Sequence, residues 1–300
     1  MSLPESLPER PVESAENGRH LDVGDTRLWV VERGRPDGVP LLVLHGGPGL
    51  DHHEFADYLD PLGDLVRLVL VDLRAQGRSD RDSDPSTWTI EQMARDVDAL
   101  GRALGPRYAV LGHSFGAFVA LAHAVALPGA AAATIVSCGV PSFGWLDGVE
   151  ANLAAFEPEH LREQVAASWA REESVSTPEE FAELMHEQEP FHFADPLDPR
   201  IPDYQRRTAG TVYAPDVLRA MAASGYGGLD VEDRLGAVTS PLLALAGRHD
   251  RTCPADAAGV IAAGVPAGRA LVFERSGHMP FVEEQDAYLD AVRGFLAEVL

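Results

Sequence analysis

Short runs of apolar residues, rich in Val, Leu and Ile, alternate along this chain with longer segments of helical length. Such runs are typical of buried strands, and segments whose apolar residues recur every three or four positions are typical of helices that cover a sheet. The alternation predicts an α/β fold with a mostly parallel sheet between layers of helices. The predicted strands, the first of them an edge strand, span residues 26–32, 41–44, 67–71, 107–111, 132–137, 241–246 and 270–273. The predicted helices span residues 51–62, 89–104, 115–126, 254–263 and 284–300.

Residues 141–235 interrupt this alternation. They contain no strand-like run and are rich in Glu, Ala, Pro and aromatic residues, so we expect a mainly helical insertion, here called the cap segment. A helical block inserted after one strand of a sheet commonly covers the site at the strand ends. The core domain then comprises residues 1–140 and 236–300, and residues 1–20, which are rich in Pro, Glu and Ser, are expected to form a loose arm.

The charge of the chain excludes one class of partner. Its 300 residues include 24 basic and 47 acidic side chains, which gives a net charge of −23. Nucleic-acid binding needs a basic face for the phosphates, so nucleic acid is not an expected partner. No stretch approaches the roughly 20 apolar residues of a membrane span, and the first residues do not resemble a secretory leader. We therefore expect a cytoplasmic protein without a membrane partner.

The two cysteines, Cys138 and Cys253, form neither a disulfide framework nor a zinc-binding pattern. Both follow predicted strands, where buried and unreactive thiols are common. We expect neither of them to be a nucleophile, and we expect no metal site.

The motif G-x-S-x-G occurs at residues 112–116, which read GHSFG. It follows a predicted strand and opens the predicted helix 115–126, which is the context of a sharp turn that presents a nucleophilic serine. Small residues are needed beside the serine because neighbouring backbone crowds this turn. The helix N-terminus behind it favours developing negative charge. Ser114 is therefore the predicted nucleophile.

A serine hydroxyl becomes a good nucleophile when a base removes its proton, so a histidine is required. Where a serine is presented in this way, an acid and then a histidine follow it along the chain. His278, in the segment SGHMP after the last predicted strand, is the predicted base. Asp250 ends the segment LLALAGRHD and is the predicted acid that orients this histidine. Asp256, inside the following predicted helix, is the weaker candidate.

An acyl-transfer site also needs two N–H groups that point at the substrate oxygen. One is expected from Phe115, the residue after the nucleophile. The other is expected from the loop at residues 45–49, which reads HGGPG and whose glycines allow the backbone to approach a substrate closely. We assign this donor to Gly47, with its neighbour Gly46 as the alternative. The side chain of His45 is expected to anchor the loop.

Taken together, these motifs resemble the α/β-hydrolase superfamily across nearly the whole chain. The segments that carry the resemblance are residues 45–49 (HGGPG), 72–79 (DLRAQGRS), 112–116 (GHSFG), 247–250 (GRHD) and 277–278 (GH). The resemblance implies a mostly parallel eight-stranded sheet with helices on both faces and an inserted helical cap. It also implies that Asp72, Arg74 and Ser79 brace the loops around the site.

The HGGPG loop and the D-x-R-x-x-G-x-S segment together look most like the proline iminopeptidase branch of that superfamily. This resemblance implies an aminopeptidase that removes an N-terminal residue, typically proline, from short peptides or amides, with neither a metal nor an organic cofactor. In that case cap aromatics such as Trp145, Phe191 and Phe193 would hold the ring of the substrate. A cap carboxylate, with Glu189 as the candidate, would hold its amine.

Two segments depart from the pattern of that branch. Its members usually carry G-G-S-W-G around the serine, whereas His113 and Phe115 flank Ser114 here. They also bind the substrate's ammonium with cap glutamates in a Glu-Asn-x-Tyr-Phe context, and the corresponding region here reads DYQRRTAGTVYAPD. Glu187 and Glu232 are further candidates for this role besides Glu189. A carboxylesterase or lactonase that acts on a small-molecule ester is therefore the alternative function.

Overall fold

The structure is a computed structural model that describes residues 18–300. Within this part of the chain, eight strands form one sheet in the order β1-β2-β4-β3-β5-β6-β7-β8. Strand β2 runs antiparallel to both β1 and β4, and the other neighbouring pairs are parallel. The strands are β1 (Gly18–Asp22), β2 (Arg27–Gly34), β3 (Pro40–Leu44), β4 (Arg67–Val71), β5 (Ala109–His113), β6 (Ala133–Ser137), β7 (Leu242–Gly247) and β8 (Gly268–Phe273). The predicted fold class, an α/β-hydrolase sheet of eight mostly parallel strands, is confirmed.

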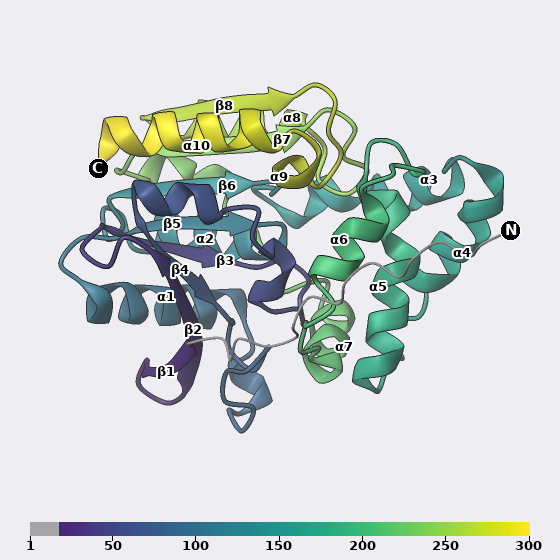
Figure 1. Cartoon of the computed structure of the whole chain (residues 1–300), viewed down its shortest axis with the longest axis horizontal. Helices are drawn as coiled ribbons and strands as arrows, with labels where there is room; N and C mark the ends of the chain where they lie inside the picture. Colours follow the sequence, from purple (N-terminus) through teal and green to yellow (C-terminus); the bar gives the residue numbers. More distant parts are fainter. Residues whose placement is uncertain (1–17) are drawn as a thin grey trace, which may run out of the picture.

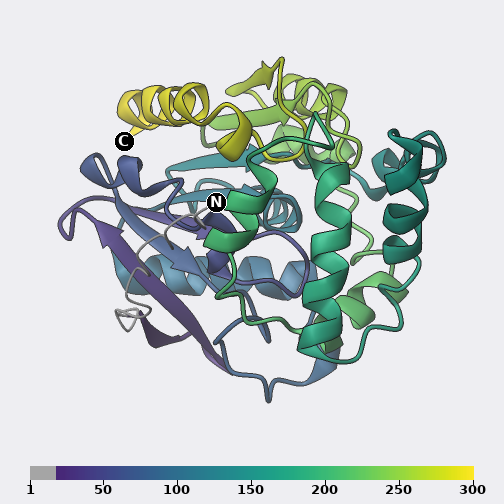
Figure 2. The ribbon, with the colours of Figure 1, turned by 45° about the vertical axis from the view of Figure 1, so that its right-hand side comes forward.

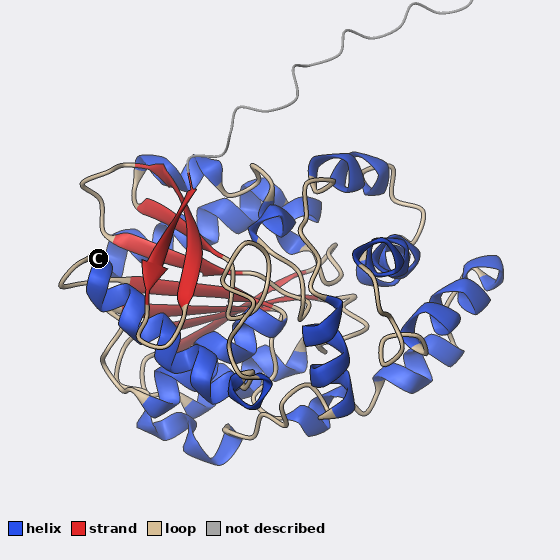
Figure 3. Cartoon of the chain, turned by 90° about the horizontal axis from the view of Figure 1, so that it is seen from below, coloured by secondary structure: helices blue, strands red, loops and turns tan. Residues whose placement is uncertain are grey.

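Helices cover both faces of this twisted sheet (Figure 3). One face packs against α1 (Ile90–Leu104), α2 (Phe115–Ala126) and α8 (Asp256–Gly264), and the other against α10 (Gln285–Val299) and the short α9 (Pro280–Glu283). Within β5, the side chain of Val110 lies in the first of these cores and that of Leu111 in the second, as the two-residue period of a buried strand requires. Among the described residues, no helix is both long and apolar enough to cross a membrane.

The cap segment leaves the sheet after β6 and returns to it at β7. Its helices lie beyond the carboxyl ends of the parallel strands (Figures 1 and 2). They are α3 (Val149–Ala154), α4 (Glu159–Trp169), α5 (Pro178–His192), α6 (Ile201–Arg207) and α7 (Pro215–Ala223). The two ends of the segment are joined at its base, where Ser142 and Asp230 form an isolated antiparallel bridge.

Part of the cap packs directly on a core loop. Leu50, from the loop after β3, lies in one apolar cluster with Phe181 and Leu184 of α5 and with Leu218 of α7. The main-chain N–H of Ala214 donates to the carbonyl of Gly49 in the same loop, at 2.8 Å. The loop predicted to bind the substrate oxygen is thus held from above by the cap.

The N-terminal region differs from prediction. Residues 18–20 of the predicted loose arm belong to β1, and residues 1–17 of that arm lie outside the described residues. Strand β1 was missed because its sequence, GRHLD, is polar and mostly exposed. Since β1 pairs with β2, the predicted edge strand at residues 26–32 lies inside the sheet.

The predicted helix at residues 51–62 is also wrong. The chain instead forms two 3₁₀ helices, His52–Phe55 and Asp60–Asp64. The first begins at Asp51, whose side chain accepts the N–H of His53, and it ends at Ala56, which has a φ of 42°. A left-handed residue of this kind cannot continue a helix, so the apolar periodicity of the segment was misleading.

Candidate active site

Ser114 lies in the sharp turn between β5 and α2. Its φ of 52° and ψ of −118° are strained for a residue with a side chain. Glycine is required on both sides of the turn. A Cβ atom at Gly112 would lie 2.0 Å from the carbonyl oxygen of Gly116, and one at Gly116 would lie 2.3 Å from that of Leu44. The turn therefore holds Ser114 at the carboxyl end of the sheet, as the motif predicts.

His278 and Asp250 meet as the sequence order predicts. His278 lies in the loop after β8 and Asp250 in the loop after β7, and these strands are neighbours in the sheet. Nδ1 of His278 donates to Oδ2 of Asp250 at 2.7 Å. The other oxygen of Asp250 accepts the main-chain N–H groups of Thr252 at 2.8 Å and Cys253 at 2.9 Å. Asp256 is exposed in the first turn of α8.

The environment of Asp250 keeps its carboxylate ionised. Burial alone would raise its pKa. The electrostatic attraction of His278 and its hydrogen bond, together with the N–H groups of Cys253 and Thr252, outweigh burial and lower the pKa of Asp250 below its ordinary value. A carboxylate held in this way fixes the imidazole with its proton on Nδ1, so that Nε2 is left as the acceptor.

Gly46 and Gly47, the two candidate oxyanion donors in the loop after β3, differ in whether their N–H groups are already hydrogen-bonded. The N–H of Gly46 is already engaged, because it donates to Oε2 of Glu54 at 2.6 Å. For the N–H of Gly47, no acceptor is present among residues 18–300. Gly47 lines the same cavity as Ser114 and His278. Phe115 is the first residue of α2, and the N–H groups of a first helical turn have no intrahelical acceptor. This geometry favours Gly47 over Gly46 as the partner of Phe115.

His45 fixes the peptide that carries this N–H. Its Nε2 accepts the N–H of Leu73 at 3.1 Å, so its proton is on Nδ1, which donates to the carbonyl of Gly46 at 2.8 Å. In a trans peptide the C=O and the N–H point in opposite directions. Holding the Gly46 carbonyl on the His45 side therefore directs the Gly47 N–H away from that side chain.

Glu54 is a buried residue that joins three loops of the site. Besides the N–H of Gly46, it contacts Nδ1 of His113 at 3.1 Å, and Nε2 of His113 donates to the carbonyl of His278 at 2.9 Å. Burial would raise the pKa of Glu54, but His113 and the Gly46 N–H lower it below its ordinary value. Burial would lower the pKa of His113, but Glu54 raises it. The two side chains therefore form a buried carboxylate–imidazolium pair.

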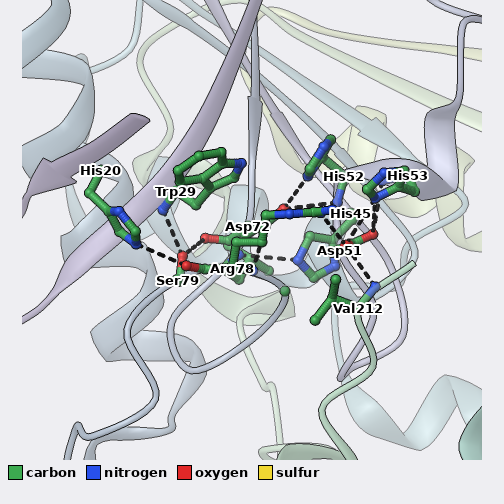
Figure 4. Close-up of polar contacts among 12 residues, drawn as sticks. His20, Trp29, His45, Asp51, His52, His53, Asp72, Arg78, Ser79 and Val212 are labelled. Atoms are coloured by element: carbon green, nitrogen blue, oxygen red, sulfur yellow. Dashed lines mark hydrogen bonds and ion pairs between the residues drawn. The ribbon is translucent and has the colours of Figure 1, made fainter. Parts of the chain in front are cut away.

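A second polar network lies behind the oxyanion loop (Figure 4). Oδ1 of Asp72 accepts both the main-chain N–H of His52 at 3.0 Å and its Nδ1 at 2.5 Å, and Oδ2 accepts the N–H of Arg78 at 2.7 Å. The hydroxyl of Ser79 donates to the carbonyl of Asp72 at 2.6 Å. Asp51 extends this network to the cap, because its Oδ2 accepts the N–H of Val212 at 2.9 Å.

Arg74 belongs to the same segment after β4 as Asp72 and Ser79, but it has different partners. It is fully buried, and it forms ion pairs with Asp96 at 2.7 Å and with Asp25 at 2.7 Å. Arg74 thus ties the segment after β4 to α1 and to the turn between β1 and β2, whereas Asp72 is the residue that bonds to the loop after β3.

A cavity of about 380 Å³ lies between the sheet and the cap. Ser114 and His278 line it from the core, together with other core residues such as Glu54 and Phe118. Cap side chains line the rest of it, and most of these are apolar or aromatic residues from α4 to α7 and from the loops around them. Of the side chains predicted to bind substrate, Phe193 and Glu189 line this cavity. Phe191 packs instead in an apolar cluster with Phe156 and Val165, inside the cap. The indole N–H of Trp145 donates to Glu232 at 2.8 Å, at the base of the cap.

Two buried carboxyl groups line the upper part of the cavity. Burial raises the pKa of Glu189 to about 8 and that of Glu172 to about 7. Glu172 is satisfied by Gln188, which donates at 2.8 Å, and by the hydroxyl of Tyr226. Oε2 of Glu189 is buried and has no partner among residues 18–300. Glu189 thus lines the cavity and has one buried carboxyl oxygen without a partner in the described part of the chain.

The cap also holds the loop that carries His278. The N–H of His278 donates to the carbonyl of His192 at 2.6 Å. Glu283 bridges the two segments, because it accepts the N–H of Ala194 in the cap and that of Gly277 in the loop, both at 2.8 Å. Arg251, next to the predicted acid, donates to the carbonyls of residues 191, 193 and 194. The position of the predicted base thus depends on the cap.

Potential metal ligands near the site are engaged in hydrogen bonds. In the described part of the chain, three groups have ligand atoms within 4.8 Å of one another, namely His113/Cys138/His278, Asp250/Cys253/His278 and Asp51/His52/His53. In the first group, hydrogen bonds use both nitrogens of His113, and in both of the first two groups the bond to Asp250 uses Nδ1 of His278. Both cysteines are buried and unpaired, and burial raises the pKa of each thiol well above its ordinary value.

Comparison with known proteins agrees with this architecture. A model of the α/β hydrolase fold family matches residues 39–285. The chain belongs to this family. This α/β hydrolase is 27% identical over 273 residues to a proline iminopeptidase of Heyndrickxia coagulans, a match that covers 87% of this chain and 92% of the relative. It is therefore a proline iminopeptidase-like member of the family, and it is an enzyme that hydrolyses ester or amide bonds.

Solved structures support the same fold. An α/β fold family hydrolase from Bacillus anthracis superposes on this hydrolase with a TM-score of 0.77 at 22% identity, over 95% of this chain and 99% of that one. A thermophilic esterase from Thermogutta terrifontis superposes with a TM-score of 0.70 at 25% identity, over 91% and 94% of the two chains. The fold is thus shared by relatives named for peptidase and for esterase activity.

Proposed function

We propose that this α/β hydrolase is a serine hydrolase that works through an acyl-enzyme formed on Ser114. The observation that carries the proposal is the pairing of His278 with Asp250 at 2.7 Å, at the floor of a cavity that Ser114 also lines. Because Asp250 holds the proton of the imidazole on Nδ1, Nε2 is free to accept the proton of the serine hydroxyl.

In the proposed reaction, His278 removes the proton of Ser114 as the hydroxyl oxygen attacks the substrate's carbonyl carbon. The N–H groups of Gly47 and Phe115 stabilise the tetrahedral oxyanion. The imidazolium of His278 then protonates the departing amine or alcohol as the acyl-enzyme forms. Water, activated by the same histidine, releases the acid and restores Ser114.

For the substrate, we propose an aminopeptidase of the proline iminopeptidase type that acts on short peptides or amides. The similarity to a proline iminopeptidase supports this choice, and so does the free buried carboxyl oxygen of Glu189 at the cavity. An ammonium group that binds next to Glu189 would ionise it, because a nearby positive charge favours the carboxylate. Phe193 would contact the ring of the N-terminal residue from the cap side.

The alternative is a carboxylesterase or lactonase with the same catalytic residues. Two observations favour it as the second candidate. The similarity to a solved esterase covers 91% of this chain. Burial raises the pKa of Glu189 to about 8, so this group is largely protonated near neutral pH and suits an uncharged substrate.

Two measurements test these proposals. Intact-mass analysis after treatment with a fluorophosphonate should show an adduct on the wild type and none on Ser114→Ala, because the serine oxygen displaces fluoride from phosphorus. An unmodified wild type would refute the serine mechanism. Rates on proline p-nitroanilide and on p-nitrophenyl butyrate then separate the substrates. Turnover of the butyrate ester with none of the proline amide would refute the aminopeptidase and leave the esterase.

A further inference from the structure

His192, the last residue of α5, places a second imidazole next to the predicted base. Its ring centroid lies 5.2 Å from that of His278, and the two ring planes are tilted by 34°. The same residue accepts the His278 N–H through its main-chain carbonyl, so its position relative to the base is fixed. The side chain of His192 lines the cavity.

The ring nitrogens of His192 are not used within the protein. Among residues 18–300, neither nitrogen has a hydrogen-bond partner, although the ring contacts those of Trp169, Phe191 and His278. Burial, with a smaller contribution from His278, lowers the pKa of His192 to about 3. The ring is therefore neutral and offers one N–H donor and one acceptor to the cavity.

Trp169 of α4, next to His192, carries a second unused donor. Its ring centroid lies 6.3 Å from that of His192, and it lines the same cavity. Its indole Nε1 is buried and has no acceptor within the described part of the chain. An indole N–H can only donate, so a partner for it must bring an acceptor atom. Buried donors without acceptors are uncommon in folded proteins and suggest that a ligand supplies the partner.

The position of His192 identifies the part of the substrate that it would meet. Nδ1 of His278 is bound to Asp250, so Nε2 is the nitrogen that must protonate the leaving atom. The leaving group therefore lies within hydrogen-bond reach of His278. The oxyanion donors, Gly47 and Phe115, come from the loops after β3 and β5, whereas His192 approaches His278 from the cap.

We propose that His192 and Trp169 form a polar subsite for the leaving group, and that this subsite selects leaving groups that carry a hydrogen-bond acceptor oxygen near the scissile bond. In a peptide this oxygen is the carbonyl of the second residue, and in an ester it is an ether or hydroxyl oxygen of the alcohol. The inference rests on the proposed acyl-enzyme reaction at Ser114. It does not depend on which acyl group the cavity accepts.

A matched pair of leaving groups tests the subsite. The butyrate esters of 2-methoxyethanol and of 1-butanol share one acyl group and nearly the same shape, and they differ by one oxygen. If the wild type prefers amides, the proline amides of 2-methoxyethylamine and butylamine replace them. The ratio of kcat/KM for the oxygen-containing substrate to that for the alkyl one should fall about tenfold in His192→Phe, as expected for the loss of one hydrogen bond. His186→Phe, an exposed histidine on the same helix, should leave the ratio unchanged.

Two further variants make the test independent of the folding of His192→Phe. Trp169→Phe removes only the indole N–H and should lower the same ratio, whereas His192→Gln keeps a side-chain N–H and should restore part of it. Equal ratios in the wild type, His192→Phe and Trp169→Phe would overturn the subsite while the turnover itself supports the serine mechanism. A wild type that hydrolyses neither pair would contradict the proposed function, and the subsite with it.

Discussion

Glu54 and His113 form a buried pair next to the turn that carries Ser114, with 3.1 Å between Oε1 and Nδ1. Through its other oxygen Glu54 holds the N–H of Gly46, and through Nε2 His113 holds the carbonyl of His278. One pair of side chains thus sets the spacing between the oxyanion loop, the serine turn and the histidine loop. Neither residue is required to react with the substrate, so both are positioning residues.

The charge of this pair and its hydrogen bonds can be tested separately. In Glu54→Gln the amide can still accept the Gly46 N–H and donate to a neutral His113, so we expect kcat to fall by less than about fivefold. In Glu54→Ala both contacts are lost, and we expect kcat to fall about 100-fold and the free energy of unfolding to fall by about 3 kcal/mol. Steady-state kinetics and urea denaturation measure both effects. Equal losses in the two variants would show that the charge itself is essential.

His45 is expected to act on the transition state through the Gly46–Gly47 peptide. In His45→Phe the Gly46 carbonyl loses its donor and the peptide can rotate, so we expect kcat to fall by about 10²-fold, similar to the removal of one oxyanion donor. KM for the same ester should change little, and affinity for a boronic acid that mimics the tetrahedral state should fall with kcat. His123→Phe is the matched control, because that histidine is equally buried and bonds to Tyr108 instead. A change in KM with no fall in kcat would contradict this role of His45.

Asp250 should be needed for the tautomer of His278 and not for the fold. In Asp250→Asn the amide still accepts the N–H groups of Thr252 and Cys253, but its NH₂ group favours the wrong imidazole tautomer. We expect kcat to fall by about 10³- to 10⁴-fold with a native circular dichroism spectrum. Asp256→Asn, the exposed acid a few residues later, should keep full activity. Full activity in Asp250→Asn and a large loss in Asp256→Asn would assign the role of the acid to Asp256.

Glu189 should make stability depend on pH. Its pKa is about 8 in the folded protein, above the ordinary value of an unfolded glutamate, so unfolding releases a proton between these two values. Stability therefore falls as pH rises through this range and levels off above about pH 8. Relative to the wild type, Glu189→Gln should gain about 2–3 kcal/mol of unfolding free energy between about pH 5.5 and about pH 8. Urea denaturation at both pH values measures this, with Glu183→Gln, exposed on the same helix, as control. If the unfolding free energies of Glu189→Gln and the wild type differ by the same amount at both pH values, Glu189 does not titrate in this range.

Much of the site follows from the sequence because its residues sit at strand ends. Ser114 comes directly after the buried strand β5, and Asp250 lies in the loop after the buried strand β7. His278 lies in the loop after β8, whose residues are mostly exposed. Parallel neighbouring strands bring these ends to one edge of the sheet. Their order along the chain and the glycines around them are local signals. The same holds for the loop of Gly47, which follows β3, the neighbour of β5.

The residues that the sequence did not reveal are those whose roles depend on tertiary contacts. Glu54 lies in a segment whose periodicity suggested an ordinary helix, and its burial results from the 3₁₀ geometry that begins at Asp51. His192 shares a helix with exposed charged residues, and no local pattern distinguishes it from them. Glu189, on the same helix, was a candidate only through the family resemblance. Phe191 and Phe193 are separated by a single residue, and no sequence pattern distinguishes them. Phe191 nevertheless packs inside the cap, whereas Phe193 lines the cavity.

The hydrogen bond from His278 to the main chain of His192 has a consequence for how this architecture can be recombined. Chimeras that exchange cap segments between related hydrolases are an obvious route to new specificities. In this protein the exchanged cap segment would include the main-chain groups that hold His278 in place. Arg251, Glu283 and His278 all bind main-chain atoms of residues 191–194. Main-chain recognition tolerates changes of side chain but not of backbone path. A graft that preserves this short path can vary freely elsewhere, whereas one that shifts it disables the catalytic machinery of a core that is otherwise intact.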